Sequence, residues 1–584
     1  MRHAPTPNTF NQGNTLIIML NRQLPRSLKS LALAGSAALL LTSAGAWAAD
    51  PVIKPYFQFK KAPMVQLAND ISLDTNGAQP PVFNAAPGYL LGFEGVSQYD
   101  GASLGRNAIP PDTMGAVGRT QYMVTTNGAY AVYNKTDGTR LSLLSDSAFW
   151  ISAGQTGTNG DTRLMYNADA SRWVMVAFGS NVKDLNVAVS DTDNALGPWK
   201  SVKFEGYAGL GFGGTADYPT LALDKNAVYI GTNNFAPATS GGVNSFRGTT
   251  MNVLPLNDLF KPDLSAPSAA GLKQFVTPFT GGAGDVDRGF AQQGVNNNRT
   301  GSSTGKVVAA SAFLSDNLAF NVNGLSPTSA AAATVTAPVF TNAAAFTSPG
   351  AARQPSVAIP ANRRIVDALD ERLSSSVYEV NGRIYTVMTV NSGADPLDEA
   401  RVRWTVLDSN TFSILAQGDI GQAGFDYYQG SIAVNADGQV VIGYNRSGLD
   451  STIGKISFMA QSFNTAAGGA LVPTSGELLL KVSLTDDYHN GSGFGLASSG
   501  RQRWGDYSQV SVDPSDPTQF YLIGQFAREY NNAAGGHPGG TGGSRWSTWV
   551  AVVGVTAVPE PSTWLMMIMG FAAVGLAARR RQLV

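Results

Sequence analysis

Cysteine is missing from all 584 residues of the sequence. Its absence excludes a disulfide framework, a thiolate nucleophile and a cysteine-based metal site, so stability must come from a buried core. Charge is scarce as well, because Asp, Glu, Lys and Arg make up 14% of the chain against about 25% in typical globular proteins. Apolar runs are short: Trp564 to Ala578 spans fifteen residues, whereas a membrane-spanning helix normally needs about 20.

The N-terminal 48 residues have the pattern of a secretory signal peptide. Arg22, Arg26 and Lys29 supply a positive region, an apolar stretch follows, and Ala46-Trp47-Ala48 offers a small-x-small cleavage site. A signal of ordinary length would begin at Met19, which we take as the alternative true start. An uncleaved anchor is the other interpretation of residues 1–48.

Residues 49–584 carry no excess of positive charge. Residues 1–48 contain four Lys or Arg and no acid, which leaves 36 basic against 41 acidic residues after signal removal. Such a body has no electrostatic reason to bind nucleic acid. The sequence therefore predicts an exported protein with no nucleic-acid partner.

A second targeting pattern lies at the C-terminus, in residues 556–584. Pro559, Glu560 and Pro561 hold the backbone extended before the apolar run. Basic residues follow the run, with the sign expected of a flank held on the cytoplasmic side; they are Arg579, Arg580 and Arg581.

This order of Pro-Glu-Pro, apolar helix and Arg tail resembles the PEP-CTERM sorting signal of Gram-negative bacteria. The resemblance implies an exosortase-type membrane enzyme as processing partner, in bacteria that often make exopolysaccharide. It also implies a transmembrane helix held transiently in the inner membrane, followed by periplasm, cell surface or extracellular matrix. A simple C-terminal anchor is the alternative.

The body between the two signals consists of weakly repeated units that begin with Asp. Each unit continues into an alternating strand, a turn and a second apolar strand, and the Asp residues are spaced by 49, 56, 153, 56 and 80 positions. Turn signals such as Asp137-Gly138, Asn381-Gly382 and Asp437-Gly438 separate the strands. The spacing predicts an all-β fold, a six- or seven-bladed β-propeller over residues 93–555, preceded by an irregular, Pro-rich lead segment at 49–92. A tandem pair of β-sandwiches is the alternative.

The body also resembles a family of uncharacterised exported bacterial proteins that look like sialidase-type propellers. The matching stretches include PPDTMGAVG, DYPTLALD and RWGDYSQVSVDPSDP. Ser190 to Trp199 is similar to a sialidase Asp-box, but Gly197 and Trp199 fall too late for a full match. This resemblance implies a propeller and leaves the activity open.

The repeated Asp residues are the candidate site, because equivalent positions of a propeller's inner strands face one another around the central channel. Two arginines lie two residues after their Asp, and tyrosines, together with Trp504, add aromatic surface for stacking on sugar rings. The candidate residues at the channel rim are Asp112, Asp161, Arg163, Asp217, Tyr218, Asp370, Arg372, Asp426, Tyr427, Asp506 and Tyr507.

Three interpretations of this carboxylate ring remain. Paired acids can cleave a glycosidic bond, an all-oxygen cluster can bind Ca²⁺, or each Asp can accept hydrogen bonds that hold the blades together. Repetition in every unit favours the third. We therefore expect a protein that binds extracellular polysaccharide or a surface partner without catalysis, with a sialidase-like glycoside hydrolase or a lyase acting on exopolysaccharide as the alternative.

Overall fold

Most strands of the body pair antiparallel, and central ones such as β10 (Arg172–Phe178) are buried along their whole length. The computed structural model describes residues 65–66, 78–207, 214–236, 246–280, 284–297, 303–355, 365–391, 393, 399–489, 501–530 and 544–556. All of them belong to one unit, Pro51–Val584. The predicted signal peptide, the Pro-Glu-Pro motif, the apolar run and the Arg tail lie outside these residues. No helix among the described residues is long and apolar enough to cross a membrane.

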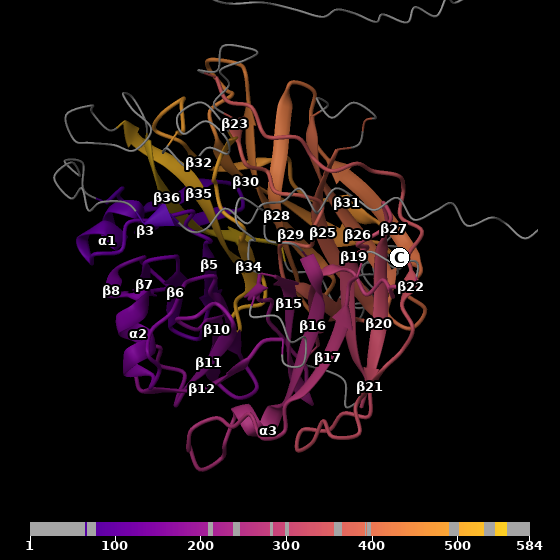
Figure 1. Cartoon of the computed structure of the whole chain (residues 1–584). Helices are drawn as coiled ribbons and strands as arrows, with labels where there is room; N and C mark the ends of the chain where they lie inside the picture. The colour runs from indigo at the N-terminus through magenta and orange to yellow at the C-terminus, as the bar shows by residue number, and fades with distance from the viewer. Residues whose placement is uncertain are drawn as a thin grey trace, which may run out of the picture. The chain divides into compact units, whose positions relative to one another are not determined.

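Five sheets have four or five strands (Figure 1). The first two contain β5 (Met114–Val117), β6 (Gln121–Thr125), β7 (Ala129–Asn134) and β8 (Arg140–Ser145), then β9 (Arg163–Asn167), β10 (Arg172–Phe178), β11 (Asp184–Ser190) and β12 (Trp199–Glu205). The third contains β13 (Thr215–Asp217), β14 (Ala222–Leu223), β15 (Ala227–Phe235), β16 (Phe246–Pro255) and β17 (Lys273–Pro278). The fourth contains β28 (Phe425–Val434), β29 (Gln439–Gly448), β30 (Ser457–Thr465), β31 (Leu471–Pro473) and β32 (Leu478–Val482).

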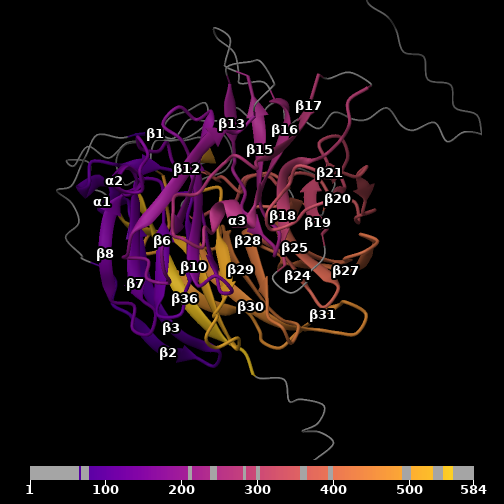
Figure 2. The ribbon, with the colours of Figure 1, turned by 90° about the horizontal axis from the view of Figure 1, so that it is seen from below.

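The fifth of these sheets joins the two ends of the described chain. It combines β2 (Val82–Ala86) and β3 (Tyr89–Ser97) with β34 (Gln509–Val512), β35 (Gln519–Tyr530) and β36 (Ser544–Gly554). Strand β3 pairs with β36, and Figure 2 shows the two side by side. Residues 82–86 and 89–92, which the sequence analysis places in an irregular lead segment, are thus strand residues of the body.

A sixth sheet has nine strands and changes the predicted blade arrangement. It contains β18 (Phe290–Asn296), β19 (Gly305–Ala310), β20 (Asn317–Asn323), β21 (Thr334–Val335), β22 (Val339–Phe340), β24 (Val377–Val380), β25 (Arg383–Asn391), β26 (Ala400–Asp408) and β27 (Ile414–Ile420). Two antiparallel runs meet where β18 and β24 pair in parallel. The prediction of six or seven separate blades is therefore corrected: five blades are sheets of their own, and the parallel ladder joins β18–β22 and β24–β27 into one further sheet.

Short elements complete the described structure. They are the two-stranded pairs of β1 (Val65–Gln66) with β4 (Ala108–Ile109) and of β23 (Ile365–Val366) with β33 (Arg501–Gln502), and the helices α1 (Gln98–Ser103), α2 (Asp146–Ser152) and α3 (Leu256–Leu259).

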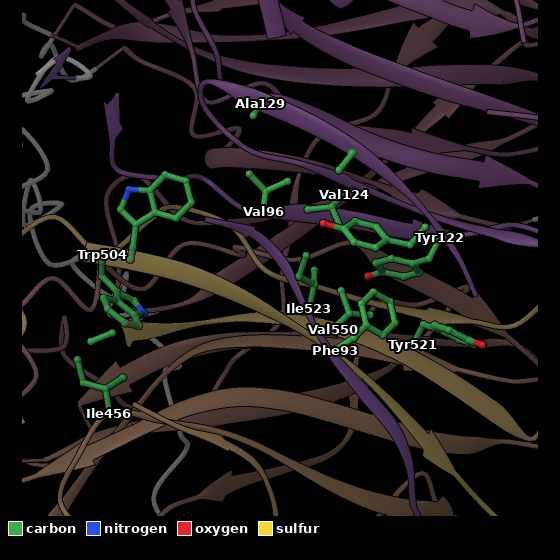
Figure 3. Close-up of a cluster of buried hydrophobic side chains, with 14 of the residues drawn as sticks. Phe93, Val96, Tyr122, Val124, Ala129, Ile456, Trp504, Tyr521, Ile523 and Val550 are labelled. Atoms are coloured by element: carbon green, nitrogen blue, oxygen red, sulfur yellow. The ribbon is translucent and has the colours of Figure 1, made fainter. Parts of the chain in front are cut away.

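Contacts between neighbouring sheets close the array into a β-propeller. The first strand of one sheet contacts the first strand of a neighbouring sheet, as in β5 with β9, β28 with β34, and β34 with β5. Apolar side chains fill the space between sheets, because a sheet with two apolar faces needs a neighbour on each side. Between the first sheet and the sheet of β3, for example, Phe93, Tyr122, Ile523 and Val550 meet (Figure 3), with the Tyr122 and Tyr521 rings stacked 5.5 Å apart.

Candidate functional site

Two of the repeated Asp residues occupy the same local conformation before an inner strand. Asp112 and Asp161 have φ values of 45° and 55° and precede β5 and β9. Asp and Asn are enriched in this left-handed region because their short polar side chains bond locally. The backbone at the start of each strand thus accounts for Asp at these two positions.

Asp112 connects the first sheet to the segment that leads into β34. One carboxylate oxygen accepts the Asp506 N–H (2.8 Å), and the other accepts the Asn127 side-chain amide (2.7 Å). The Asn127 side-chain oxygen in turn accepts the Asp161 N–H (2.9 Å). Asn127, in the turn between β6 and β7, therefore bridges the two acids.

Arg503 supplies positive charge among these acids. Its guanidinium lies 3.0 Å from the Asp506 carboxylate and 3.8 Å from that of Asp367. The side chain is buried, and its attraction to Asp506, Asp112 and Asp367 outweighs desolvation, so its pKa is raised and it stays charged.

Tyrosines pack directly beside this group. The Tyr507 hydroxyl donates to Asp161 (3.3 Å), and the Tyr218 hydroxyl donates to the Asp506 carbonyl (3.3 Å). Their rings lie 4.8 Å apart, and the Arg163 guanidinium lies 4.0 Å from the Tyr507 ring. Cation–π contact of this kind stabilises a buried arginine.

Both predicted arginines are bonded within the protein. Arg163 donates to the carbonyls of Pro219 (3.0 Å) and Ser374 (3.2 Å). Arg372 forms a bidentate pair with Asp370 at 2.6 and 2.7 Å and lies 4.4 Å from the Tyr218 ring. We call the linked set the central cluster: Asp112, Asp161, Arg163, Tyr218, Asp370, Arg372, Arg503, Asp506 and Tyr507.

Three predicted site residues have other surroundings. Asp426 pairs with Arg353 (2.7 Å) and accepts the Ala400 N–H (3.1 Å). Tyr427 points to Glu477, 3.4 Å from its hydroxyl. Asp217 ends β13, opposite Asn233, and only the next residue, Tyr218, turns into the cluster.

Burial changes the protonation of the cluster. Desolvation raises the pKa of Asp112 well above its ordinary value, the nearby Asp506 and Asp161 raise it further, and Arg503 opposes them. Burial and Asp161 likewise raise the pKa of Tyr507. The neutral form of Asp112 is therefore favoured over a wider pH range than in a free carboxyl group, which limits the negative charge that Arg503 must balance.

Aromatic surface for a sugar is not available at the predicted positions. Tyr218, Tyr507 and Trp504 are buried, and the Trp504 indole donates to Asn445 (3.1 Å). Within the described ranges, no group of three or more acids or histidines could hold a metal ion. The arrangement gives no support to the Ca²⁺ interpretation.

Three residues of this site were not predicted from the sequence. Arg503 had a usable signal, because it lies inside the RWGDYS stretch that also contains Asp506 and Tyr507. No sequence signal marked Asn127 or Asp367, because an Asn beside Gly and an Asp in a loop are ordinary turn residues.

The fold and this cluster define the described part of the chain as an all-β β-propeller with a buried ionic centre. Residues 557–581 match the PEP-CTERM protein-sorting motif. The match confirms the C-terminal resemblance and indicates a protein that is exported and sorted at the membrane, with processing by an exosortase. A comparison with curated proteins finds no match.

Matches among solved structures include a lyase, an arabinase and a sialidase. A polysaccharide lyase, an ulvan lyase, has 11% identity and a TM-score of 0.33, over 75% of this chain and 91% of that chain. The endo-arabinase of Bacteroides thetaiotaomicron has 11% identity and a TM-score of 0.26, over 68% and 95%. Trypanosoma rangeli sialidase has 10% identity and a TM-score of 0.28, over 65% and 52%. Scores this low carry no inference about activity.

Proposed function

We propose that this protein is an exported, exosortase-sorted β-propeller that binds extracellular polysaccharide or a surface partner without catalysis. The observation that carries the proposal is the internal bonding of the central acids. Asp112 accepts from Asp506 and Asn127, Asp161 from Tyr507, and Asp370 from Arg372.

Catalysis on a glycosidic bond requires two carboxyl groups that face a bound sugar with room between them. Here Asp112 is 2% exposed and its two oxygens receive donors from the protein itself. The same bonds tie β5 to the segment before β34, where the first and last units of the ring meet. We therefore assign the central cluster to ring closure and propose that ligand binding takes place elsewhere on the propeller.

A propeller glycoside hydrolase or lyase remains the second candidate function. It is favoured by one observation, the raised pKa of Asp112 beside Asp161 and Asp506. A buried carboxyl group with a raised pKa beside other acids is an environment that general-acid catalysis uses.

The route of the protein follows from its ends. We propose that residues 1–48 are removed as a signal peptide and that the apolar C-terminal helix holds the chain transiently in the inner membrane. After processing, the propeller occupies the periplasm, the cell surface or the extracellular matrix.

Asp161→Asn decides between binding and catalysis. We expect the full-length protein in detergent micelles to bind exopolysaccharide, to release neither reducing ends nor unsaturated uronate from it, and to retain its affinity when Asp161 is replaced. Asp437→Asn, in an exposed turn, is the matched control. Product release by the wild type that Asp161→Asn abolishes and Asp437→Asn preserves would establish the hydrolase or lyase instead.

A further inference from the structure

A pocket of about 550 Å³ lies outside the central cluster. It is formed by residues 78–81 before β2, by β3 and α1, by the ends of β7 and β8 with the turn between them, and by one side chain of β35. It therefore lies where the sheet of β3 and β36 meets the first sheet. Pockets of about 300–1,000 Å³ are typical of small-molecule sites. The volume suits a ligand of one or two sugar rings.

The charged side chains of the pocket form two ion pairs. Glu94 and Arg528 are 2.9 Å apart and nearly fully buried, so they form its floor. Asp100 and Arg140 are 2.7 Å apart, and the Arg140 side chain is 41% exposed, so this pair lies at the mouth. Opposite charges are equal in number, which favours a neutral ligand over a polyanion.

Three aromatic rings line the pocket, and Tyr99 is the one whose face a ligand can reach. Phe93 and Tyr133 are buried and Tyr99 is half-buried, and all three line the pocket. Burial raises the pKa of Tyr133, and Asp100 raises it further, so its hydroxyl stays protonated. Aromatic faces receive the C–H surface of a pyranose ring in the same way as other apolar groups, and a hydroxyl at the edge adds a polar contact.

The polar groups are held in place before any ligand arrives. The Ser97 backbone N–H and hydroxyl both donate to Asp100 at 2.8 Å, and the Ser547 hydroxyl donates to Glu94 at 2.6 Å. A carboxylate has about four acceptor positions and a guanidinium five N–H donors, so Asp100 and Arg140 retain capacity for the adjacent hydroxyls of a sugar. Preorganisation of this kind lowers the entropic cost of binding.

We infer that this pocket binds a neutral saccharide unit, with Tyr99 packing on the ring and the Asp100–Arg140 pair bonding its hydroxyls. The inference rests on the proposed polysaccharide-binding function and locates it. Burial of Glu94 and Arg528 assigns them to the support of the pocket, whereas Tyr99 and Arg140 are the residues that a ligand reaches.

Titration of the full-length protein in detergent micelles with neutral and uronate-containing oligosaccharides tests the inference. We expect Tyr99→Ala and Arg140→Ala to raise the Kd for the neutral oligosaccharides by about tenfold or more. Tyr99→Phe, which keeps the ring, should stay within about threefold. Arg383→Ala, on the distant strand β25, should leave the Kd unchanged, and near-ultraviolet circular dichroism checks folding.

The outcomes separate the two proposals. Binding that persists in both pocket variants overturns the pocket and leaves the proposed function standing. Tight binding of uronate oligosaccharides alone overturns the neutral ligand class. Absence of binding to every saccharide overturns the polysaccharide function itself. If Tyr99→Ala does not fold, Arg140→Gln removes the charge on a half-exposed side chain and takes its place, and an unchanged Kd in that variant overturns the pocket.

Discussion

Asp112 shows how burial and neighbouring charges act on one residue of the central cluster. Its carboxyl group lies near those of Asp161 and Asp506, with the single guanidinium of Arg503 opposing all three. Three ionised acids in a buried site would repel one another and lose their hydration. Burial and the neighbouring acids favour the neutral form of Asp112, whereas the N–H bond from Asp506 favours the ionised form.

The raised pKa of Asp112 predicts a pH dependence of stability. In the unfolded chain Asp112 titrates near about 3.9, so from about pH 4 up to its raised pKa the folded protein holds a proton that the unfolded chain has released. The free energy of unfolding therefore falls with rising pH in this window, by at most about 1.4 kcal/mol per pH unit. We expect Asp112→Asn to remove this contribution, so that urea unfolding shows a shallower decline than in the wild type.

The matched control is Asp437→Asn in the exposed turn between β28 and β29. It should follow the wild-type pH profile. An Asp112→Asn profile with the wild-type slope would mean that Asp112 is ionised in the folded protein.

Glycine turns show how far the elements follow from local sequence. Asn381-Gly382 joins β24 to β25 with φ values of 53° and 74°, as the Asn-Gly pair predicts. Asp137-Gly138 and Asp437-Gly438 likewise lie between paired strands. The signals are reliable because the left-handed backbone of such turns excludes most other residues.

Substitutions at two glycines distinguish the stability cost of backbone strain from that of steric crowding. At Gly382 a Cβ would meet nothing closer than the Ser409 hydroxyl at 3.9 Å, so Gly382→Ala should cost only the strain of positive φ, about 1 kcal/mol. At Gly128, φ is 107° and a Cβ would lie 2.6 Å from the Arg106 carbonyl oxygen. We expect Gly128→Ala to cost about 2–4 kcal/mol, because a fixed backbone atom adds overpacking.

Urea unfolding of the two variants, side by side, checks this order. Equal losses of stability would show that the backbone around Arg106 moves aside and that the close approach does not constrain the turn.

The pairing of strands that lie far apart in the sequence could not be predicted from local sequence. The prolines around Val82 and Tyr89 predict an irregular lead, yet this stretch forms β2 and β3, and β3 pairs with β36. Likewise, no local signal marks the parallel ladder that joins Val295 to Val377. The partners of such ladders lie far apart in the sequence, and only packing of the folded sheets brings them together.

For the whole molecule, the sorting tail should be separable from the propeller. Residues 557–581 carry the sorting motif, whereas the last described strand ends at Gly554. We expect deletion of residues 559–584 to release the body in soluble form with an unchanged thermal unfolding midpoint. Cell fractionation and circular dichroism of the released protein measure both.

The full-length protein, grown in parallel, provides the reference for fractionation and unfolding. A truncated body that fails to fold would mean that these residues belong to the propeller and do not act as a separate sorting signal.

The sequence by itself determined the all-β class, the hairpin turns and the sorting motif, because each depends on residues that are neighbours in the chain. The repeats also led to the prediction that six aspartates share one rim, whereas the structure places Asp217 and Asp426 in other surroundings. Only the tertiary structure decided that Arg503 and Asn127 join the acids of the central cluster, that Asp426 pairs with Arg353 instead, and that Trp504 is core. The reason is physical: partners and burial depend on contacts between sheets, and those contacts exist only once the ring has closed.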